Sequence, residues 1–115
     1  MTRLKIYEPL AKLTKFVYNL EFPTDEKFNL ESQIKRAVVS IRLNLREGNA
    51  YYNKIRNRLF NVAKGSLVEV DECMIIMTEL KYIKQKDYDN FKLIYWECLN
   101  KLNKLITSIS QEKQK

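Results

Sequence analysis

The sequence predicts an all-α protein in which four amphipathic helices pack as an antiparallel up-down-up-down bundle. The chain of 115 residues contains only two glycines and two prolines, so few positions force a helix to stop. Along four separate stretches, apolar residues recur at spacings of three and four, the pattern of a helix that buries one face. Short connections between these stretches favour packing of each helix against the next.

The first helix is expected over residues 6–20. Phe22-Pro23 then breaks the pattern, because proline lacks a backbone N–H and disfavours helical geometry at the preceding residue. Residues 24–28 are therefore expected to form a connecting loop. The buried seam of this helix consists of Ile6, Leu10, Leu13, Val17 and Leu20.

The second helix is expected to begin at Asn29, whose side chain can accept hydrogen bonds from the first free N–H groups, and to run to about Glu47. Gly48-Asn49 is the strongest turn signal in the sequence, since both residues tolerate a positive φ at low steric cost. The pair is predicted to form the tip of a helical hairpin. The seam of the second helix consists of Leu30, Ile34, Ala37 or Val38, Ile41 and Leu45.

The third and fourth helices are expected over residues 55–80 and 88–109, because the spacing of three and four continues through both stretches. The fourth helix has the widest apolar face, and this face includes Tyr95 and Trp96. Such a face predicts self-association, the alternative being an ordinary, fully buried helix. Residues 1–110 form one domain in this interpretation, and the polar tail 111–115 is expected to fray.

The positive charge is concentrated in one segment. The chain has a formal net charge of +7, and residues 35–64 account for all of it, because eight cationic residues there oppose only Glu47. A local excess of this kind is typical of a surface that binds phosphate groups or an acidic partner, although it can also serve solubility alone.

Two stripes of cations flank the predicted hairpin tip. Arginine and lysine side chains in such stripes can contact phosphates, while adjacent tyrosines at the tip can stack on unpaired bases. In the alternative interpretation the tyrosines cap the end of the bundle and the cations are only solvated. The candidate nucleic-acid-binding residues are Lys35, Arg42, Arg46, Tyr51, Tyr52, Lys54, Arg56 and Arg58.

A second group of residues is predicted to hold the hairpin together. Gly65 lies inside the third helix, which suggests close approach by the second helix, and Arg36 is expected to pair with Glu69 across the hairpin. The S-x-x-E sequence that starts at Ser66 matches a helix-capping motif, but it lies inside a continuous helical pattern, so the match is incidental. The structural hairpin residues are Arg36, Ser40, Asn44, Glu47, Gly48, Gly65, Ser66 and Glu69.

Several functions are disfavoured by what the chain contains. It has no histidine and no glycine-rich nucleophile or phosphate loop, so we expect neither an enzyme nor a cofactor. The acidic residues near Glu69 fall on different helix faces, so no metal site is expected there.

Cys73 and Cys98 are expected to be core residues in a reducing compartment. With no apolar run of the ~20 residues that cross a bilayer and no signal peptide, the chain is expected in the cytoplasm.

Several stretches resemble the 23S ribosomal RNA intervening-sequence proteins, which are related to the accessory variability proteins of diversity-generating retroelements. The resemblance spans about residues 7–109, and Glu47-Gly48 and Gly65-Ser66 are its most specific parts. Departures are Arg42, where the family commonly has proline, and the more basic and aromatic tip NAYYNKIRNR. The retroelement branch's C-terminal signature is absent, which favours the intervening-sequence branch. The stretches are VSIRLNLREGN (39–49), AKGSLVEVDECM (63–74), Phe22-Pro23 followed by Lys27-Phe28, and the spacing from LKYI to Tyr88.

The resemblance implies a four-helix bundle that assembles into a homopentameric barrel. It also implies two kinds of partner: RNA or a ribonucleoprotein, as inferred for the intervening-sequence proteins, or a reverse transcriptase, as for the retroelement proteins. The sequence therefore predicts a non-enzymatic, oligomeric, RNA-binding bundle, and the alternative is an adaptor that docks onto a reverse transcriptase.

Overall fold

The computed structural model describes the backbone of residues 4–114 and the side chains of residues 4–108. Its four α-helices confirm the predicted all-α class, and no strand is present among the described residues. Two short helical segments, Thr24–Glu26 and Lys27–Glu31, precede the second long helix. The α-helices are α1 (Tyr7–Tyr18), α2 (Ser32–Asn49), α3 (Asn53–Glu79) and α4 (Gln85–Gln114).

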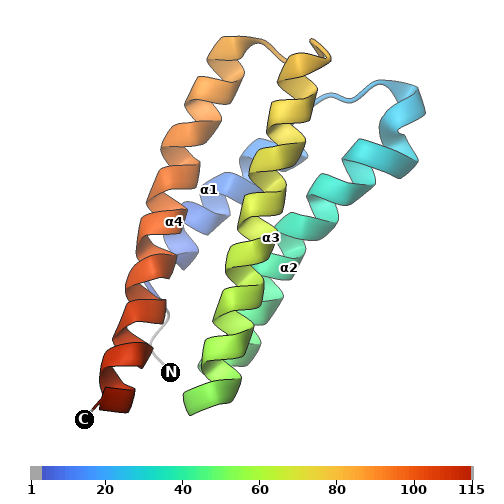
Figure 1. Cartoon of the computed structure of the whole chain (residues 1–115). Coiled ribbons are helices and arrows are strands. Elements are labelled where there is room, and N and C mark those ends of the chain that lie inside the picture. The colour runs from blue at the N-terminus through green and yellow to red at the C-terminus, as the bar shows by residue number, and fades with distance from the viewer. Residues whose placement is uncertain (1–3, 115) are drawn as a thin grey trace.

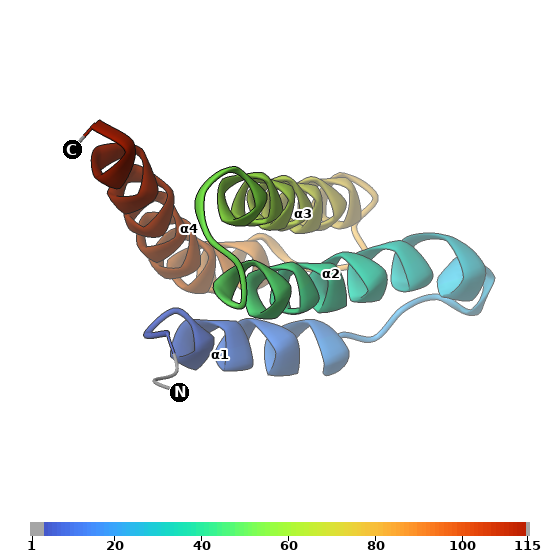
Figure 2. The same cartoon turned by 90° about the horizontal axis from the view of Figure 1, so that it is seen from below.

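The helices form an elongated body of 50 × 25 × 23 Å (Figure 1). Each long helix packs against the next in the sequence, and α4 also packs against α1. Figure 2 shows α2 between α1 and α3, with α4 beside this row. Helices α2 and α4 therefore occupy opposite corners of the body. Nowhere between residues 4 and 114 is a helix long and apolar enough to span a membrane.

The core lies along the axis of the body and is built from the predicted seams. Leu13 of α1, Ile41 of α2 and Phe91 of α4 are fully buried. The predicted seam of the third helix needs a correction, because its members Ile55, Val62 and Leu80 are about half exposed. The buried members are Leu59, Ser66, Val70, Cys73 and Met77. The fully helical backbone of α4 extends to Gln114, while the side chains beyond residue 108 and all of Lys115 lie outside the described residues. The expected fraying of the tail stays a prediction.

The connection into α2 differs from the expected loop. Residues Thr24–Glu26 form a 3₁₀ turn and Lys27–Glu31 a π-helical turn. Asn29 does not cap α2, because it lies inside the π-helical turn and no side-chain hydrogen bond caps the start of α2. Its Nδ2 instead donates to Glu26 Oε1 at 2.9 Å. The buried Glu26 carboxylate also accepts a hydrogen bond from Tyr82 Oη at 3.0 Å. This carboxylate holds the connection in a helical path, and Tyr82 lies too far along the chain for the local sequence pattern to reveal it.

The hairpin turn also lies later than expected. Gly48 and Asn49 are the last residues of α2, the chain reverses over residues 50–52, and the positive φ of 57° occurs at Asn53. Gly48 is buried in the helix contact, since a Cβ atom there would lie 2.8 Å from two ring carbons of Phe60. Gly65 was expected to permit a close approach, yet no atom outside the adjoining backbone of α3 lies within 4 Å of a Cβ atom placed there. The close approach is thus at Gly48.

Alanine substitutions at the two glycines are expected to change the free energy of unfolding in opposite directions. Gly65→Ala is expected to raise the free energy of unfolding by up to about 1 kcal/mol, because alanine favours a helix and meets open space. Gly48→Ala gains the same helix preference, but the added methyl group clashes with the buried Phe60 ring, and overpacking costs about 1–3 kcal/mol. Urea unfolding followed by circular dichroism at one protein concentration measures both. A stabilising Gly48→Ala would contradict the contact.

A polar ladder connects α2 to α3. Ser40 and Ser66 share a hydrogen bond of 2.9 Å between their hydroxyl groups, and Asn44 Nδ2 donates to the Ser40 carbonyl and hydroxyl oxygens at 2.8 and 3.1 Å. The structure therefore brings together three of the predicted hairpin residues. The expected Arg36–Glu69 pair is wrong, because Gln33 Nε2 donates to Glu69 Oε1 at 3.1 Å while Arg36 is exposed.

One acidic residue of α3 forms hydrogen bonds with two residues of α4. Asp71 accepts hydrogen bonds from Tyr88 Oη at 2.9 Å and from Lys92 Nζ at 3.1 Å. The carboxylate of Glu69 therefore binds to α2, whereas that of Asp71 binds to α4. In the part of the chain that the structure describes, no group of three or more histidine, cysteine, aspartate or glutamate residues could hold a metal ion.

Both cysteines are free thiols buried in the core, as expected. Burial raises the pKa of Cys98 to about 12. Burial also raises the pKa of Cys73, and the carboxylates of Glu69 and Glu72 add to this shift. Both side chains therefore stay neutral and act as packing groups.

Candidate nucleic-acid interface

The hairpin tip is organised by Arg56, in the first turn of α3. Its Nε donates to the carbonyl oxygens of Tyr51 at 2.8 Å and Gly48 at 3.3 Å, and its Nη2 donates to that of Asn49 at 3.4 Å. Carbonyl groups at a helix C-terminus lack partners within the helix, and a cation there is also favoured by the helix dipole. Arg56 therefore caps α2 and fixes the turn, a structural role that the sequence pattern does not indicate.

Two of the predicted cations on α2 are held against α1. Arg42 Nη1 donates to Thr14 Oγ1 at 3.2 Å. Lys35 Nζ lies 5.0 Å from the centre of the Tyr18 ring and 3.8 Å from Glu31 Oε1. The pattern of α2 alone could not reveal these α1 partners. Both cations are partly committed to contacts within the chain and are therefore weaker candidates for binding RNA.

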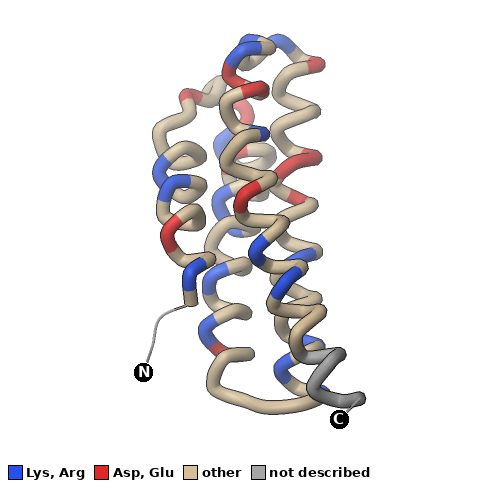
Figure 3. The backbone as a smooth tube through the Cα atoms, turned by 90° about the vertical axis from the view of Figure 1, so that its left-hand side faces the viewer, with Lys and Arg blue, Asp and Glu red and all other residues tan. Residues whose placement is uncertain are grey.

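The remaining predicted cations are exposed at the tip. Arg46 lies in the last turn of α2, and Lys54 and Arg58 lie at the start of α3. None of the three has a hydrogen bond or an ion pair within the part of the chain that the structure describes. We call them the tip cations. Figure 3 shows positive residues near the end of the body where the chain turns between α2 and α3.

The two tyrosines at the turn differ in exposure. Tyr51 is 44% exposed and Tyr52 is 75% exposed, and the Arg56 guanidinium lies 5.2 Å from the centre of the Tyr52 ring. This cation–π contact orients one of the rings next to the tip cations. The exposure of Tyr52 argues against a capping role for this ring, whereas the more buried Tyr51 is compatible with the interpretation in which it caps the end of the bundle. Exposed aromatic rings beside unpaired cations can stack on bases while the cations meet phosphates.

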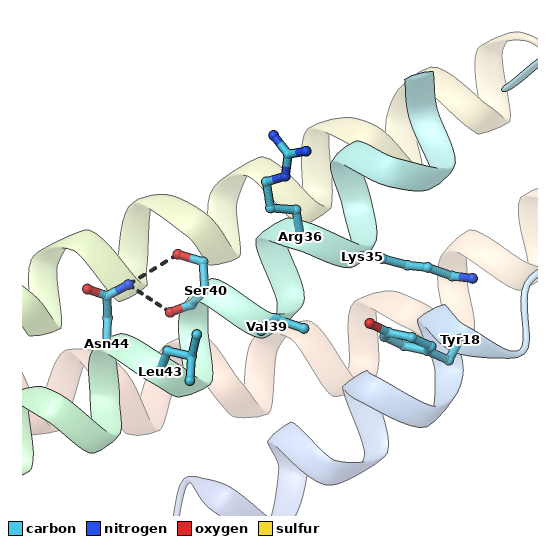
Figure 4. Close-up of a pocket in the computed structure, with 7 residues that line it drawn as sticks. All are labelled: Tyr18, Lys35, Arg36, Val39, Ser40, Leu43 and Asn44. Carbon is cyan, nitrogen blue, oxygen red and sulfur yellow. Dashed lines mark hydrogen bonds between the residues drawn. The ribbon is translucent and has the colours of Figure 1, made fainter. Parts of the chain in front are cut away.

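A shallow groove runs along the outer side of α2 with a volume of about 360 Å³ (Figure 4). Its apolar floor is formed by Val39 and Leu43, and its charged side chains are both cations. We call it the α2 groove. It is lined by Tyr18, Lys35, Arg36, Val39, Ser40, Leu43 and Asn44.

The fold and the tip define a small helical-bundle protein with a basic, aromatic hairpin end. The sequence model of the 23S rRNA-intervening sequence protein matches residues 2–104. The chain therefore belongs to the 23S rRNA-intervening sequence protein family. A comparison with curated proteins found no match. Helix α2 runs without interruption through Arg42, where the family commonly has proline, and this arginine contacts α1 instead.

Proposed function

We propose that this protein is a cytoplasmic, non-enzymatic RNA-binding protein whose four helices form an up-down-up-down bundle and whose subunits assemble into a homopentamer. The tip cations and the two tyrosines contact the RNA, or the RNA of a ribonucleoprotein. The observation that carries this proposal is the position of Arg46, Lys54 and Arg58, three exposed cations without partners in the described chain, beside exposed aromatic rings.

The chemistry of the tip supports RNA in particular. Bases in single-stranded loops can leave their stack and lie on aromatic side chains, whereas paired bases in a duplex cannot. Tyr52 is 75% exposed, and because the Arg56 guanidinium lies 5.2 Å from its ring centre, its other face is the one offered for such stacking. Assembly multiplies one such tip by the number of subunits, which raises the overall affinity when several tips reach one RNA molecule.

Light scattering with and without an RNA hairpin that has an unpaired loop, at two salt concentrations, tests this function. The expected result is a particle of five times the 13.8 kDa chain mass that becomes heavier with RNA at low salt and loses the RNA at high salt. A blunt RNA duplex of the same charge is the control, and it should bind more weakly because it offers no unpaired bases.

Failure to bind RNA would contradict the proposal. A particle that keeps its pentameric mass but ignores RNA at low salt would instead favour the second candidate, docking of the basic tip onto a protein such as a reverse transcriptase. Equal binding of the hairpin and the duplex would remove the stacking role of the tyrosines and leave only contacts with phosphates.

A further inference from the structure

A cavity of about 460 Å³ lies between the segment that precedes α1 and the C-terminal half of α4. We call it the α4 pocket. Its charged lining residues are all lysines, and its other lining residues are all apolar. A pocket of this kind suits a ligand that joins an anionic group to a less polar body. It is lined by Leu4, Lys5, Ile6, Lys101, Lys104 and Leu105.

Two of the three lysines are available to a ligand. Lys5 and Lys104 are exposed, and neither has a hydrogen bond or an ion pair within the described residues. Lys101 Nζ lies 3.9 Å from Glu97 Oε1, and a surface contact of this kind is weak. Neither Glu97 nor Glu8, the exposed acidic residue in the first turn of α1, lines the pocket. The wall of the pocket therefore keeps a net positive charge.

The apolar lining of the pocket matches a nucleotide base. Leu4 and Leu105 pack against the core but are only partly buried, so each keeps apolar surface for a ligand. Bases lie against apolar as well as aromatic side chains, while lysines contact phosphate groups. The volume of the pocket also falls within the range of about 300–1,000 Å³ that is usual for sites of small ligands. One nucleotide of an RNA strand therefore has the chemistry that this pocket requires.

The α4 pocket lies in the half of the body that ends at the hairpin tip. Figure 1 shows the start of α3 and the end of α4 at the same end of the body. Asp71 of α3 accepts a hydrogen bond from Lys92 of α4. From this contact towards that end, Arg58 is thirteen residues away along α3 and Lys104 is twelve residues away along α4. At 1.5 Å per residue, these two cations lie within about two helical turns of each other along the axis.

One RNA strand can reach both the tip cations and the pocket. The body measures only 25 × 23 Å across its long axis, so the two sites are separated by less than the length of a short strand. Sites for single-stranded nucleic acid commonly take about 4–16 nucleotides. An unpaired loop at the upper end of this range therefore spans the distance from the hairpin tip to the pocket.

We infer that the α4 pocket binds one nucleotide of an RNA strand whose unpaired loop also contacts the tip cations. The base lies against Leu4 and Leu105, and Lys5 and Lys104 contact the adjacent phosphate groups. This inference rests on the proposed RNA-binding function and deepens it, since it gives the RNA a second point of attachment outside the hairpin. Two linked contacts bind more tightly than one when a single RNA molecule spans both.

Two RNA hairpins with the same stem test the pocket. One has a loop of about 4 nucleotides, which covers only the tip, and the other has a loop of about 16 nucleotides, which also reaches the pocket. The wild-type protein is expected to bind the long loop on the order of 10-fold more tightly. Lys5→Ala combined with Lys104→Ala should remove this preference and leave the affinity for the short loop nearly unchanged. Fluorescence anisotropy with labelled hairpins measures both affinities.

The salt dependence gives a second readout. The slope of log affinity against log salt concentration falls by about 1 for each lost phosphate contact, so the double variant should lower it by about 2 for the long loop. For the short loop the slope should stay the same. Leu4→Ser keeps every charge and removes part of the apolar lining, so it should reduce the preference for the long loop without a change in slope.

A matched variant controls for net charge. Lys84→Ala combined with Lys86→Ala removes the same charge at the opposite end of the body, where both lysines are exposed. This variant should keep the wild-type preference for the long loop. Circular dichroism of each variant checks that it still folds.

The outcomes separate this inference from the proposed function. Equal wild-type affinities for the two loops would overturn the inference while RNA binding at the tip stands. The inference would also fail if the double variant lost affinity for both loops equally, or if the Lys84 and Lys86 control lost the preference. An unchanged preference in Leu4→Ser would show that no base enters the pocket. If the wild-type protein binds neither hairpin, the proposed function and the inference fail together.

Discussion

Replacing Arg46, Lys54 and Arg58 together by alanine is expected to weaken RNA binding on the order of 100-fold at low salt. Each exposed charge contact contributes up to about 1 kcal/mol, and each 1.4 kcal/mol corresponds to a tenfold change in affinity. The slope of log affinity against log salt concentration should also fall by about 1 for each cation that is lost. A fluorescence anisotropy titration with a labelled RNA hairpin at several salt concentrations measures both quantities.

A matched variant carries the same change in charge at the opposite end of the body. Lys27, Lys84 and Lys86 are exposed and lie in or beside the connections that lead into α2 and α4. Their replacement by alanine should leave the affinity nearly unchanged. Equal losses in the two triple variants would show that net charge, rather than the hairpin tip, determines binding, and the tip would then lose its assigned role.

Phe91→Ala is expected to lower the free energy of unfolding by about 3–5 kcal/mol, because it removes a large buried side chain and leaves a cavity. The Phe91 ring is fully buried, and its centre lies 6.1 Å from that of Phe16, 5.9 Å from that of Tyr88 and 5.7 Å from that of Tyr95. It therefore joins α1 to α4 through aromatic contacts that add to simple burial. Urea unfolding at a fixed protein concentration measures the loss.

Phe28→Ala is the control within the same chain. The Phe28 side chain is 90% exposed, so its removal should change the free energy of unfolding by no more than about 0.5 kcal/mol. If Phe91→Ala lowered the free energy of unfolding as little as Phe28→Ala, the aromatic contacts around Phe91 would not hold α1 and α4 together. A loss at Phe28 alone would indicate that this exposed ring packs against another subunit.

The helices could be predicted from the sequence because the apolar residues that become buried recur along each helix at spacings of three and four. The seams of the first two helices are buried as expected from Leu10 to Val17 and from Leu30 to Leu45, whereas Leu20 lies beyond the end of α1 and is only partly buried. The connections were predicted less well, because they depend on partners far along the chain. The link from Glu26 to Tyr82 spans 56 residues, and nothing in the composition of residues 24–28 indicates it.

The glycines show why residue type alone misleads. Glycine is common both at positive φ and where two helices touch, so the sequence permits either interpretation at Gly48 and Gly65. The structure places a buried ring against Gly48 and open space beside Gly65, and it gives the positive φ to Asn53. Only the packing partner, Phe60, distinguishes the cases, and its position depends on how far the turn extends.

The candidate surface was predicted as a charged segment but not as a set of contacts. Periodicity showed that Lys35, Arg42 and Arg46 share one side of α2, yet it could not show that Thr14 and Tyr18 hold two of them. Likewise, the hydrogen bonds of Arg56 to backbone carbonyl groups depend on the shape of the turn. The sequence thus identified where the charge lies, and the fold determines which cations remain exposed.

The polar ladder between Ser40 and Ser66 gives the hairpin a single register. Sliding α3 along α2 by one turn, about 5.4 Å, would separate these hydroxyl groups and move the Phe60 ring away from the only α2 position without a side chain. The backbone positions that carry Arg46, Lys54 and Arg58 therefore keep one spacing. In the proposed RNA contact, the loop adapts to this backbone spacing, so we expect the conformational cost of recognition to fall mainly on the RNA and selectivity to favour loops that reach the required shape easily.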